Sequence, residues 1–298
     1  MTDTPPGVGL PQALSPEQAT ALAKAHGLKP LGARPPFVDY CRQLWRRRSF
    51  VWTLSSAEAE EKTSQDRLGI LWTVLNPILL IISYFLIFGL LMNTRHDSSN
   101  FIGFLTIGVI IYGFSSAAMT RGTKAIVGNT SLVRALRFPR AILPLSTTLT
   151  EGLMTAPALI VLIALMLFTH EPLTWHWLLL PVALALQTLI LAGLVMMGAR
   201  LLNISRDLGN LIPVMIRLLR YVSGVFFSIQ HRTRNHEIIS AILEFQPFAL
   251  PITLVRQCLM KEYPLVWSYW GIAALWAIGL FVAGLWLFWV DEAKYGRG

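Results

Sequence analysis

Two arginines, Arg217 and Arg220, stand inside a stretch of the chain that is otherwise mostly apolar. Their spacing of three residues puts both guanidinium groups on one face of a helix. An arginine near the middle of a membrane span costs roughly 2.5–3.5 kcal/mol, so it usually faces protein or water. Guanidinium groups hold phosphate well. These arginines, followed by Tyr221 and Ser223, are therefore predicted to contact an anionic headgroup such as a lipid diphosphate.

Two other interpretations of the arginines stay open. If their span begins later in the sequence, both side chains extend to the cytoplasmic surface, as long cationic side chains do near helix ends. Alternatively, they pair with Glu151, the acidic residue at the edge of another apolar stretch.

The sequence lacks the motifs of a protein that powers its own work. It has no Gly-Lys dipeptide, so the phosphate-binding P-loop is absent, and it has no HExxH or DxD motif. Its two cysteines form no CxxC pair. We therefore expect no catalytic residue, no metal and no cofactor in this chain, and any energy must come from a partner.

The basic stretch 120–148 is the predicted site for that partner. Asn129 or Ser131 is suited to cap a short helix, and Pro139 ends it because proline disfavours helical geometry at Phe138. A short helix with apolar and basic sides fits a groove on a soluble protein. A surface turn on lipid headgroups would show the same pattern. The predicted apolar side holds Leu132, Val133 and Leu136, and the basic side holds Arg134 and Arg137.

The composition identifies the elements that must position these residues. Of 298 residues, 54% are hydrophobic and only 14% are charged, where soluble domains carry about 25% charged residues. A membrane-spanning helix needs about 20 apolar residues. We therefore expect an all-α membrane protein with six spans, near 70–92, 101–119, 149–168, 178–199, 208–229 and 269–290.

The net charge of +9 is distributed unevenly over the connections. Residues 1–69 hold nine Lys and Arg, and 120–148 hold five, whereas 169–177 hold none. Cytoplasmic loops carry the excess of positive charge. The sequence therefore predicts a multi-pass protein of the plasma (inner) membrane with both termini in the cytoplasm.

The first 66 residues are expected to form two regions. Residues 1–36 read as an N-terminal cytoplasmic extension, in which Ser15 is the N-cap of a short helix. Residues 37–66 are expected to form an interfacial helix over 37–52, followed by a connector. The helix is expected because the apolar residues of 37–52, two tryptophans among them, recur at helical spacing and basic residues lie on the other side. The transmembrane domain then covers 67–298.

The external connection 230–268 is long and contains two apolar runs that are too short to span. Runs of that length are typical of re-entrant or interfacial segments. We expect a re-entrant helical hairpin over the outer end of a cavity, although two helices lying flat on the membrane would fit the same pattern.

Four groups of residues, in this order along the chain, resemble the ABC-2 type permeases, and most closely the branch that exports lipid-linked O-antigen, teichoic acid and related polysaccharides. The first group is Leu68, Gly69, Leu71, Trp72, Leu75, Pro77, Phe88 and Gly89. The second is Asn129, Leu132, Val133, Arg134, Phe138, Pro139, Arg140, Leu143 and Pro144. The third is Arg206, Asp207, Leu208, Ser223, Gly224, Phe226 and Phe227, and the fourth is Gln246, Pro247 and Arg256.

Two features depart from the family pattern. Gln246 stands where the family usually has Asn, and the acidic residues Glu58, Glu60 and Glu61 stand where many relatives have a basic run. The long N-terminal extension and the excess of Arg over Lys resemble the galactan exporters of the mycobacterial cell wall.

The resemblance implies a permease subunit that acts as a homodimer with two copies of a cytosolic ATPase, which binds ATP and Mg. It implies that residues 120–148 form the coupling helix, with Asn129, Leu132, Val133, Arg134, Arg137, Phe138 and Pro139 transmitting force. Gln246, Pro247 and Arg256 would form the external gate. The cargo would be a polyprenyl-diphosphate-linked glycan, with cell-wall galactan as the best match.

Three other functions are compatible with parts of the pattern. A drug or small-lipid exporter of the same superfamily typically has a smaller external hairpin. A membrane enzyme acting on polyprenyl-linked sugars would need acidic or histidine residues gathered at one membrane face, and here they are scattered. A passive channel would not need a docking helix.

Overall fold

The computed structural model describes residues 36–64, 70–91, 99–135, 138–229 and 237–292, together with Ser15, Gln18, Leu22 and Ala25. The chain divides into two compact units, 1–35 and 36–298. In the first unit, the backbone amide of Ser15 donates to the side-chain oxygen of Gln18 at 3.2 Å. The backbone amide of Gln18 donates to the hydroxyl of Ser15 at 3.3 Å. This reciprocal arrangement is a capping box, as the N-cap prediction for Ser15 requires.

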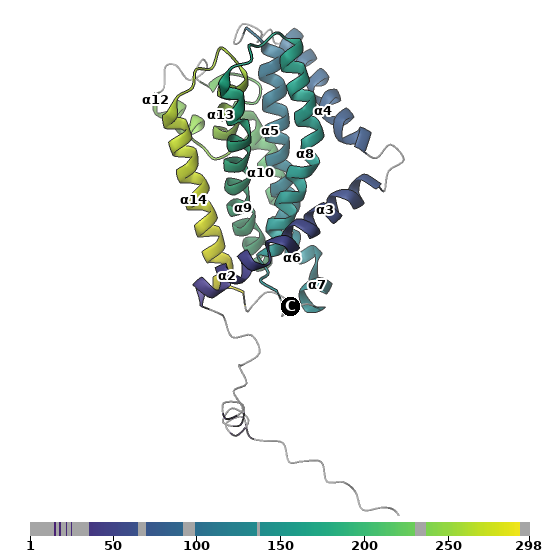
Figure 1. Cartoon of the computed structure of the whole chain (residues 1–298), viewed down its shortest axis with the longest axis vertical. Coiled ribbons are helices and arrows are strands. Elements are labelled where there is room, and N and C mark those ends of the chain that lie inside the picture. Colours follow the sequence, from purple (N-terminus) through teal and green to yellow (C-terminus); the bar gives the residue numbers. More distant parts are fainter. Residues whose placement is uncertain are drawn as a thin grey trace, which may run out of the picture. The chain divides into compact units, whose positions relative to one another are not determined.

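All regular elements in the described part of the second unit are helical, and no strand occurs there (Figure 1). The first helices are α2 (Phe37–Arg46), α3 (Arg48–Ser64) and α4 (Ile70–Tyr84), which continues as the π-helix η1 (Phe85–Leu91). They are followed by α5 (Phe101–Gly122), α6 (Ala125–Gly128), α7 (Thr130–Ala135), α8 (Ile142–Phe168), the 3-10 helix η3 (Trp175–Leu179) and α9 (Leu180–Ile204). The last are α10 (Leu208–Val222), α12 (Glu237–Glu244), α13 (Leu250–Leu259) and α14 (Trp267–Val290).

Helix α5 is the centre of the bundle. It is surrounded by α4, α8, α9, α10 and α13, and its side chains are buried along most of its length. Large residues such as Phe104, Ile107 and Tyr112 are fully enclosed. Because its faces are covered by protein, α5 is the fixed element against which the other helices are positioned.

Helices α9 and α14 cross at two glycines. A Cβ atom at Gly284 would lie 2.5 Å from the carbonyl oxygen of Gly193, and one at Gly193 would lie 2.4 Å from the backbone of Leu280. Such contacts are too close for any side chain. Small residues at a crossing allow two membrane helices to approach closely and gain packing contacts.

This crossing gives a direct prediction. Gly284→Ala is expected to lower the free energy of unfolding by about 1–3 kcal/mol, because the added methyl group forces the two backbones apart. Gly279→Ala, on the same helix but with no atom within 4 Å of the added methyl, is the matched control. Thermal unfolding in nanodiscs measures both variants. Equal melting temperatures for the two variants would contradict the close crossing.

Five helices in the described residues are long and apolar enough to cross a membrane: Leu71–Gly89, Phe101–Gly122, Ile142–Phe168, Trp175–Ile204 and Trp267–Val290. The chain is therefore a multi-pass membrane protein. The sixth expected span, 208–229, is not confirmed. Helix α10 has 15 residues, or about 22 Å at 1.5 Å per residue. It ends because Gly224 adopts a φ of +69°, a left-handed conformation that breaks the helix.

The connection expected over 120–148 is shorter than predicted. Helix α5 continues to Gly122, and α8 begins at Ile142, so the connection covers 123–141. The polar residues Ser146, Thr147 and Thr148, which were expected in the connection, lie inside α8. The hydroxyl groups of Thr147 and Thr148 each donate to the carbonyl four residues earlier, which satisfies them within the helix.

The expected interfacial helix over 37–52 consists of two helices that meet at Arg47. The apolar side of α2 is turned partly toward protein, because Tyr40 is buried and packs with Phe288 of α14 and Ala141. The tryptophans Trp45 and Trp52 are exposed. The segment expected as a connector is helical as far as Ser64, since α3 packs along α8.

The segment expected to be external contains two helices in its described part, as its apolar runs predict. Helix α13 is almost wholly buried, and packs against α9, α5 and η3. Helix α12 exposes Ile238 and Ile242. The burial of α13 is the packing that a re-entrant segment requires, and the re-entrant arrangement itself stays a prediction.

Candidate functional site

The structure gives the two predicted arginines of α10 different surroundings. The Nη1 atom of Arg220 donates to the hydroxyl of Tyr84 on α4 at 2.8 Å. Its guanidinium carbon lies 5.5 Å from the centre of the Tyr112 ring on α5, within the range of a cation–π contact. Arg220 therefore joins three helices and is half-buried.

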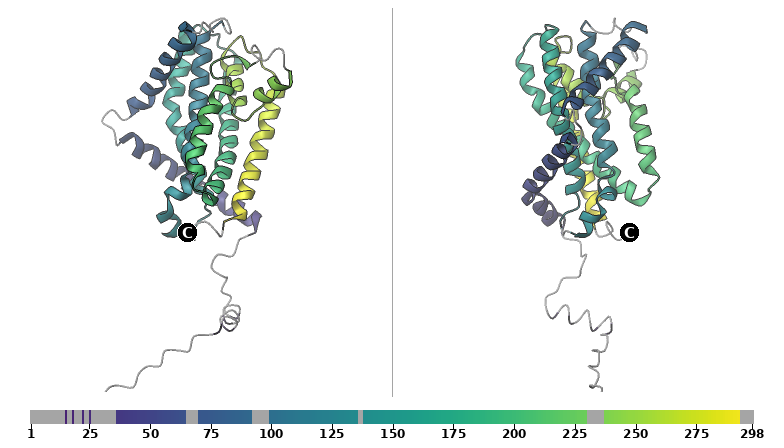
Figure 2. Two further views of the ribbon diagram at one scale, coloured as in Figure 1. Left: turned by 180° about the vertical axis from the view of Figure 1, so that it is seen from behind. Right: turned by 90° about the vertical axis from the view of Figure 1, so that its right-hand side faces the viewer.

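Arg217 and Tyr221 are exposed and lie one helical turn apart on α10. They share that surface with exposed apolar residues. In Figure 2, α10 (green) lies at the outside of the bundle, and only Gly209 and Ile216 of this helix are buried. An arginine on an apolar helix face is expected to face protein or water rather than hydrocarbon. The exposed face of α10 is thus the strongest candidate for contact with a charged group.

Neither arginine pairs with Glu151. That carboxylate binds Arg121 and Lys62 instead, so the alternative of a pairing with Arg217 and Arg220 is wrong.

The predicted gate residues meet at the C-terminal end of α10. Gln246 donates from Nε2 to the carbonyl of Val222 at 3.0 Å, and Pro247 is half-buried beside it. Arg256 is 4% exposed, and its Nη2 atom donates to the carbonyls of Gly224 and Phe104 at 2.8 and 3.2 Å. These bonds join α13 to α5 and to the turn after α10.

The left-handed turn at Gly224 makes this junction possible. Its carbonyl group accepts a hydrogen bond from Arg256, and the guanidinium carbon of Arg256 lies 3.4 Å from the centre of the Phe104 ring. Ser223, predicted to line the substrate path, is buried, and its hydroxyl donates to the Leu219 carbonyl at 2.7 Å. Ser223 is therefore enclosed by protein, whereas Arg217 and Tyr221 are exposed.

The apolar side of the predicted coupling helix faces the protein interior. Val133 is 6% exposed and, with Phe138, packs against Ile142 and Leu143 at the start of α8. Phe50 of α3 contacts the Phe138 ring edge-on, with centroids 5.9 Å apart. Val133 therefore does not face outward, as an apolar side that fits a groove on a partner would require. The cluster has this arrangement because α3 supplies apolar side chains that cover it.

The remaining predicted residues of this segment are placed as follows. Asn129 precedes α7, but its side chain donates to the carbonyl of Ala125 at 2.9 Å and so caps α6. Leu132 is half-buried in the same cluster, and Pro139 is buried. The side chain of Arg134 and the whole of Arg137 lie outside the described residues, as do Leu68 and Gly69 of the first motif.

The outward surface of α6 and α7 consists of other residues. Lys124, Val127, Thr130 and Ser131 are exposed. The two short helices lie beyond the ends of α5 and α8, beside α3 (Figure 1). A partner that contacts this segment would therefore meet a mainly polar surface, supported from behind by the buried Val133 and Phe138.

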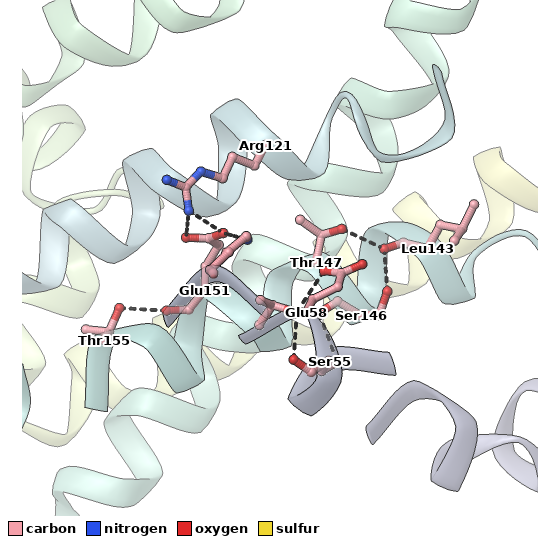
Figure 3. Close-up of polar contacts among 10 residues, drawn as sticks. Ser55, Glu58, Arg121, Leu143, Ser146, Thr147, Glu151 and Thr155 are labelled. Carbon is pink, nitrogen blue, oxygen red and sulfur yellow. Dashed lines mark hydrogen bonds and ion pairs between the residues drawn. The ribbon is translucent and has the colours of Figure 1, made fainter. Parts of the chain in front are cut away.

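A buried carboxylate links three helices near that segment. Glu151 of α8 is 3% exposed and accepts from Arg121 of α5 at 2.9 Å (Figure 3). The ammonium group of Lys62 on α3 lies 2.8 Å from the same carboxylate. Two cations from two helices thus neutralise one buried charge on a third.

Further hydrogen bonds join α3 to α8 along their contact. Ser55 is fully buried and donates to the carbonyl of Ser146 at 3.0 Å, and the hydroxyl of Thr150 donates to the Glu58 carboxylate at 3.0 Å (Figure 3). The sequence pattern alone does not identify these residues as a unit. A signal was present, since a lone Glu in an apolar stretch must find a cation, but the sequence offered several candidate cations.

A second carboxylate, that of Glu292, is partly buried at the end of α14. Glu292 accepts from the hydroxyl of Tyr40 at 2.9 Å and from the amide of Arg140 at 3.0 Å. Burial raises the pKa of this carboxyl above its ordinary value of 4.5, and the hydrogen bonds and the charge of Arg140 oppose this only in part. The interaction connects α2, α14 and the segment before α8.

The raised pKa of Glu292 predicts how stability depends on pH. The folded protein holds this proton more tightly than the unfolded chain, so the free energy of unfolding falls as pH rises from 4.5 through the raised pKa. Glu292→Gln stays uncharged and removes that contribution. We expect the melting temperature of the variant, relative to wild type, to increase between pH 4.5 and pH 7.5 in nanodiscs. A difference that is constant over this range would contradict the burial of the charge.

Within the described residues, no group of three or more His, Cys, Asp or Glu side chains is arranged to hold a metal ion.

The chain matches a known protein family over most of the helical unit. Residues 50–260, more than half of the chain, match the ABC-2 type transporter family. The match includes the buried carboxylate cluster, the α6–α7 segment, α10 and α13.

Individual relatives agree with the family match. The chain is 26% identical to an O-antigen export system permease protein RfbA from Klebsiella pneumoniae, over 81% of this chain and 91% of the relative. It is 29% identical to the protein of the same description from Myxococcus xanthus, over 63% of this chain and 72% of the relative.

Proposed function

Because the chain belongs to the ABC-2 type transporter family, we propose that it is the membrane permease of an exporter that moves a lipid-linked polysaccharide across the membrane. The observation that carries the proposal is the similarity to O-antigen export permeases over most of both chains. In this proposal the cargo is a polyprenyl-diphosphate-linked glycan, which passes from the cytoplasm to the outer leaflet.

The exposed face of α10 supports this cargo. Arg217 presents a guanidinium group on a surface that is otherwise largely apolar. Guanidinium binds diphosphate oxygens with charge-assisted hydrogen bonds, and apolar residues around it are compatible with a polyprenyl chain. We propose that two copies of the permease form a homodimer in which the α10 faces border the conduit, which keeps Arg217 away from lipid.

The energy is proposed to come from a separate cytosolic ATPase present in two copies, which binds ATP and Mg. Its contact would be the exposed surface of α6 and α7, at Val127, Thr130 and Ser131. Motion of that surface would reach α8 through Val133 and Phe138, which pack on Ile142 and Leu143. Both termini and this surface would then lie in the cytoplasm, and the protein would reside in the inner membrane.

Cell-wall galactan is the proposed glycan, on the basis of the long N-terminal extension and the excess of Arg. A drug or small-lipid exporter of the same family is the alternative that shares the fold. The relatives' descriptions favour the polysaccharide.

Native mass spectrometry of the complex, purified gently from its own membranes, tests the proposal. The expected species holds two permeases and two ATPase subunits, and retains a polyprenyl-linked glycan. A permease that is recovered alone, under conditions that preserve other transporter complexes, would contradict it. A complex that carries a phospholipid or a drug instead of a glycan would favour the alternative.

The docking surface can be tested by itself. Ser131→Trp is expected to abolish recovery of the ATPase with the permease, because Ser131 is exposed on α7 and a large ring there obstructs a partner. Ser131→Ala removes only a hydroxyl and is the matched control. Membrane insertion should be equal for both, since neither change reaches the buried cluster. Normal recovery of the ATPase with Ser131→Trp would exclude this surface as the contact.

Leu132→Asp and Val133→Asp would not test this surface, because both changes place charge inside the cluster of Phe138, Ile142 and Leu143. Loss of transport would then follow from unfolding of the segment, whether or not it binds a partner.

A further inference from the structure

Helices α2 and α3 present a stripe of aromatic and basic side chains to the outside of the helical unit. The members of this α2–α3 stripe are three or four residues apart, the spacing of one helix face, and are Val38, Arg42, Trp45, Arg48 and Trp52. All of them are exposed, Trp45 to 70% and Trp52 to 55%. The joint between the helices does not interrupt the stripe, because the guanidinium carbon of Arg48 lies 5.4 Å from the centre of the Trp45 ring. Two large rings exposed on one face indicate contact with something outside this chain.

The opposite side of α2 and α3 is covered by protein. Tyr40 of α2 is buried and packs with Phe288 of α14. Ser55 of α3 is also buried and donates to the Ser146 carbonyl of α8 at 3.0 Å. An interfacial helix ordinarily lays its apolar face on the acyl chains. Here other helices cover that face, so the side of α2 that is left for the bilayer is the α2–α3 stripe.

The stripe lies where membrane spans end. Figure 1 shows α2 across the end of α14 and α3 beside α8, at the end of the bundle that also holds α6 and α7. The contact of α3 is made with the first turns of α8, at Ser146 and Thr150. Lipid headgroups surround a membrane protein at the ends of its spans. The α2–α3 stripe is therefore placed to meet them.

The composition of the stripe indicates which headgroup it meets. Tryptophan is enriched at the membrane–water interface, where its ring suits an apolar surrounding and its N–H a polar one. Arginine extends a long stem toward the headgroups and bonds phosphate oxygens through its planar fork. Residues 37–52 hold four arginines and one acidic residue, Asp39, which lies 3.6 Å from Arg42 while both side chains stay more than half exposed. This excess of positive charge favours an anionic headgroup over a zwitterionic one.

We propose that the α2–α3 stripe binds anionic phospholipids of the phosphatidylglycerol kind. Arg42 and Arg48 donate to the lipid phosphate, and Trp45 and Trp52 lie at the level of the interface. The inference goes beyond the proposed function, because it concerns a lipid that the permease does not transport. It needs only that the chain spans a membrane, so it is tested separately from the cargo and from the ATPase.

Photo-crosslinking to the full-length permease in nanodiscs locates the lipid. The host bilayer is palmitoyl-oleoyl phosphatidylcholine, and the probe is a trace of phosphatidylglycerol with a diazirine in its headgroup. Chymotryptic peptides then show which residues carry the label. We expect label within 37–52. Unlabelled phosphatidylglycerol in the bilayer should displace the probe, whereas an equal amount of the zwitterionic phosphatidylethanolamine should not.

Arg42→Gln/Arg48→Gln removes charge from the stripe and keeps its tryptophans. It should lower the label within 37–52 about 5-fold for each arginine, the contribution of one cation near an anionic surface. Lys124→Gln/Arg206→Gln removes the same charge from exposed residues at the starts of α6 and α10, and should leave that label unchanged. Both variants should melt at the wild-type temperature, since the replaced side chains are all exposed.

The proposal is wrong if label is absent from 37–52, if phosphatidylethanolamine displaces the probe as well as phosphatidylglycerol does, or if the two double variants lose label equally. The ATPase is the other large molecule that a surface of tryptophan and arginine would suit. If Arg42→Gln/Arg48→Gln keeps its label and loses the ATPase on purification, the stripe is a protein contact instead. A complex that lacks a glycan contradicts the proposed function alone and leaves the label unchanged.

Discussion

Replacing both Arg121 and Lys62 with methionine is expected to lower the free energy of unfolding by about 3–5 kcal/mol. The double substitution leaves the carboxylate of Glu151 buried without a cation, although methionine preserves most of the packing volume. Glu151 is 3% exposed, so water cannot replace the lost partners. Thermal and denaturant unfolding in nanodiscs measure the effect.

A third substitution separates the charge from the packing. Adding Glu151→Gln removes the buried charge and should restore most of the lost stability, because the amide needs only hydrogen bonds. Each single cation variant should cost less than the pair, since the other cation remains and both are partly exposed, at 54% for Arg121 and 34% for Lys62. If the double variant is as stable as wild type, the carboxylate is not enclosed as described.

The second large effect is functional. Arg217→Gln is expected to reduce export of the lipid-linked glycan about 10-fold or more, since a hydrogen bond to a charged group contributes about 1.5–3 kcal/mol. The stability of the variant should stay within about 0.5 kcal/mol of wild type, because Arg217 is exposed. The measurements are the amount of glycan at the outer leaflet and the melting temperature of the purified complex.

Arg220→Gln is the matched control for that experiment. It is the same change three residues away, but it removes the hydrogen bond from Arg220 to Tyr84 and the contact with the Tyr112 ring. We expect a lower melting temperature for Arg220→Gln and not for Arg217→Gln. Arg217→Lys should recover part of the export, because it keeps the charge without the planar fork. If Arg217→Gln exports the glycan at the wild-type level, Arg217 does not contact the cargo.

The two expected effects concern different parts of the same permease. The Glu151 cluster fixes α3 against α8 and α5, close to the segment proposed to bind the ATPase. The face of α10 is exposed and makes few contacts within the chain. In the proposed function, the first region gives a rigid connection to the energy source and the second gives a surface free to meet the cargo.

The positions of the long helices could be predicted from the sequence because hydropathy is a local property. Five expected spans correspond to helices at Leu71–Gly89, Phe101–Gly122, Ile142–Phe168, Trp175–Ile204 and Trp267–Val290. The family could also be recognised, since its motifs depend on residue type and order. The end of α10 could not be placed from the sequence, because a glycine such as Gly224 can either continue a helix or end it. The structure shows that the chain turns there, since Gly224 has a left-handed conformation and its carbonyl accepts a hydrogen bond from Arg256.

What each charged or apolar residue does was decided by tertiary structure. Glu151 could have met any of several cations, and the packing of α3 on α8 selected Lys62, while α5 supplied Arg121. The sequence pattern around Val133 fits either an outer docking surface or an inner core. In the structure Val133 belongs to the core, because Phe50 of α3 covers the cluster around Phe138. Periodicity gives the side of a helix on which a residue lies. Which neighbour covers that side depends on segments distant in sequence, and only the folded chain brings them together.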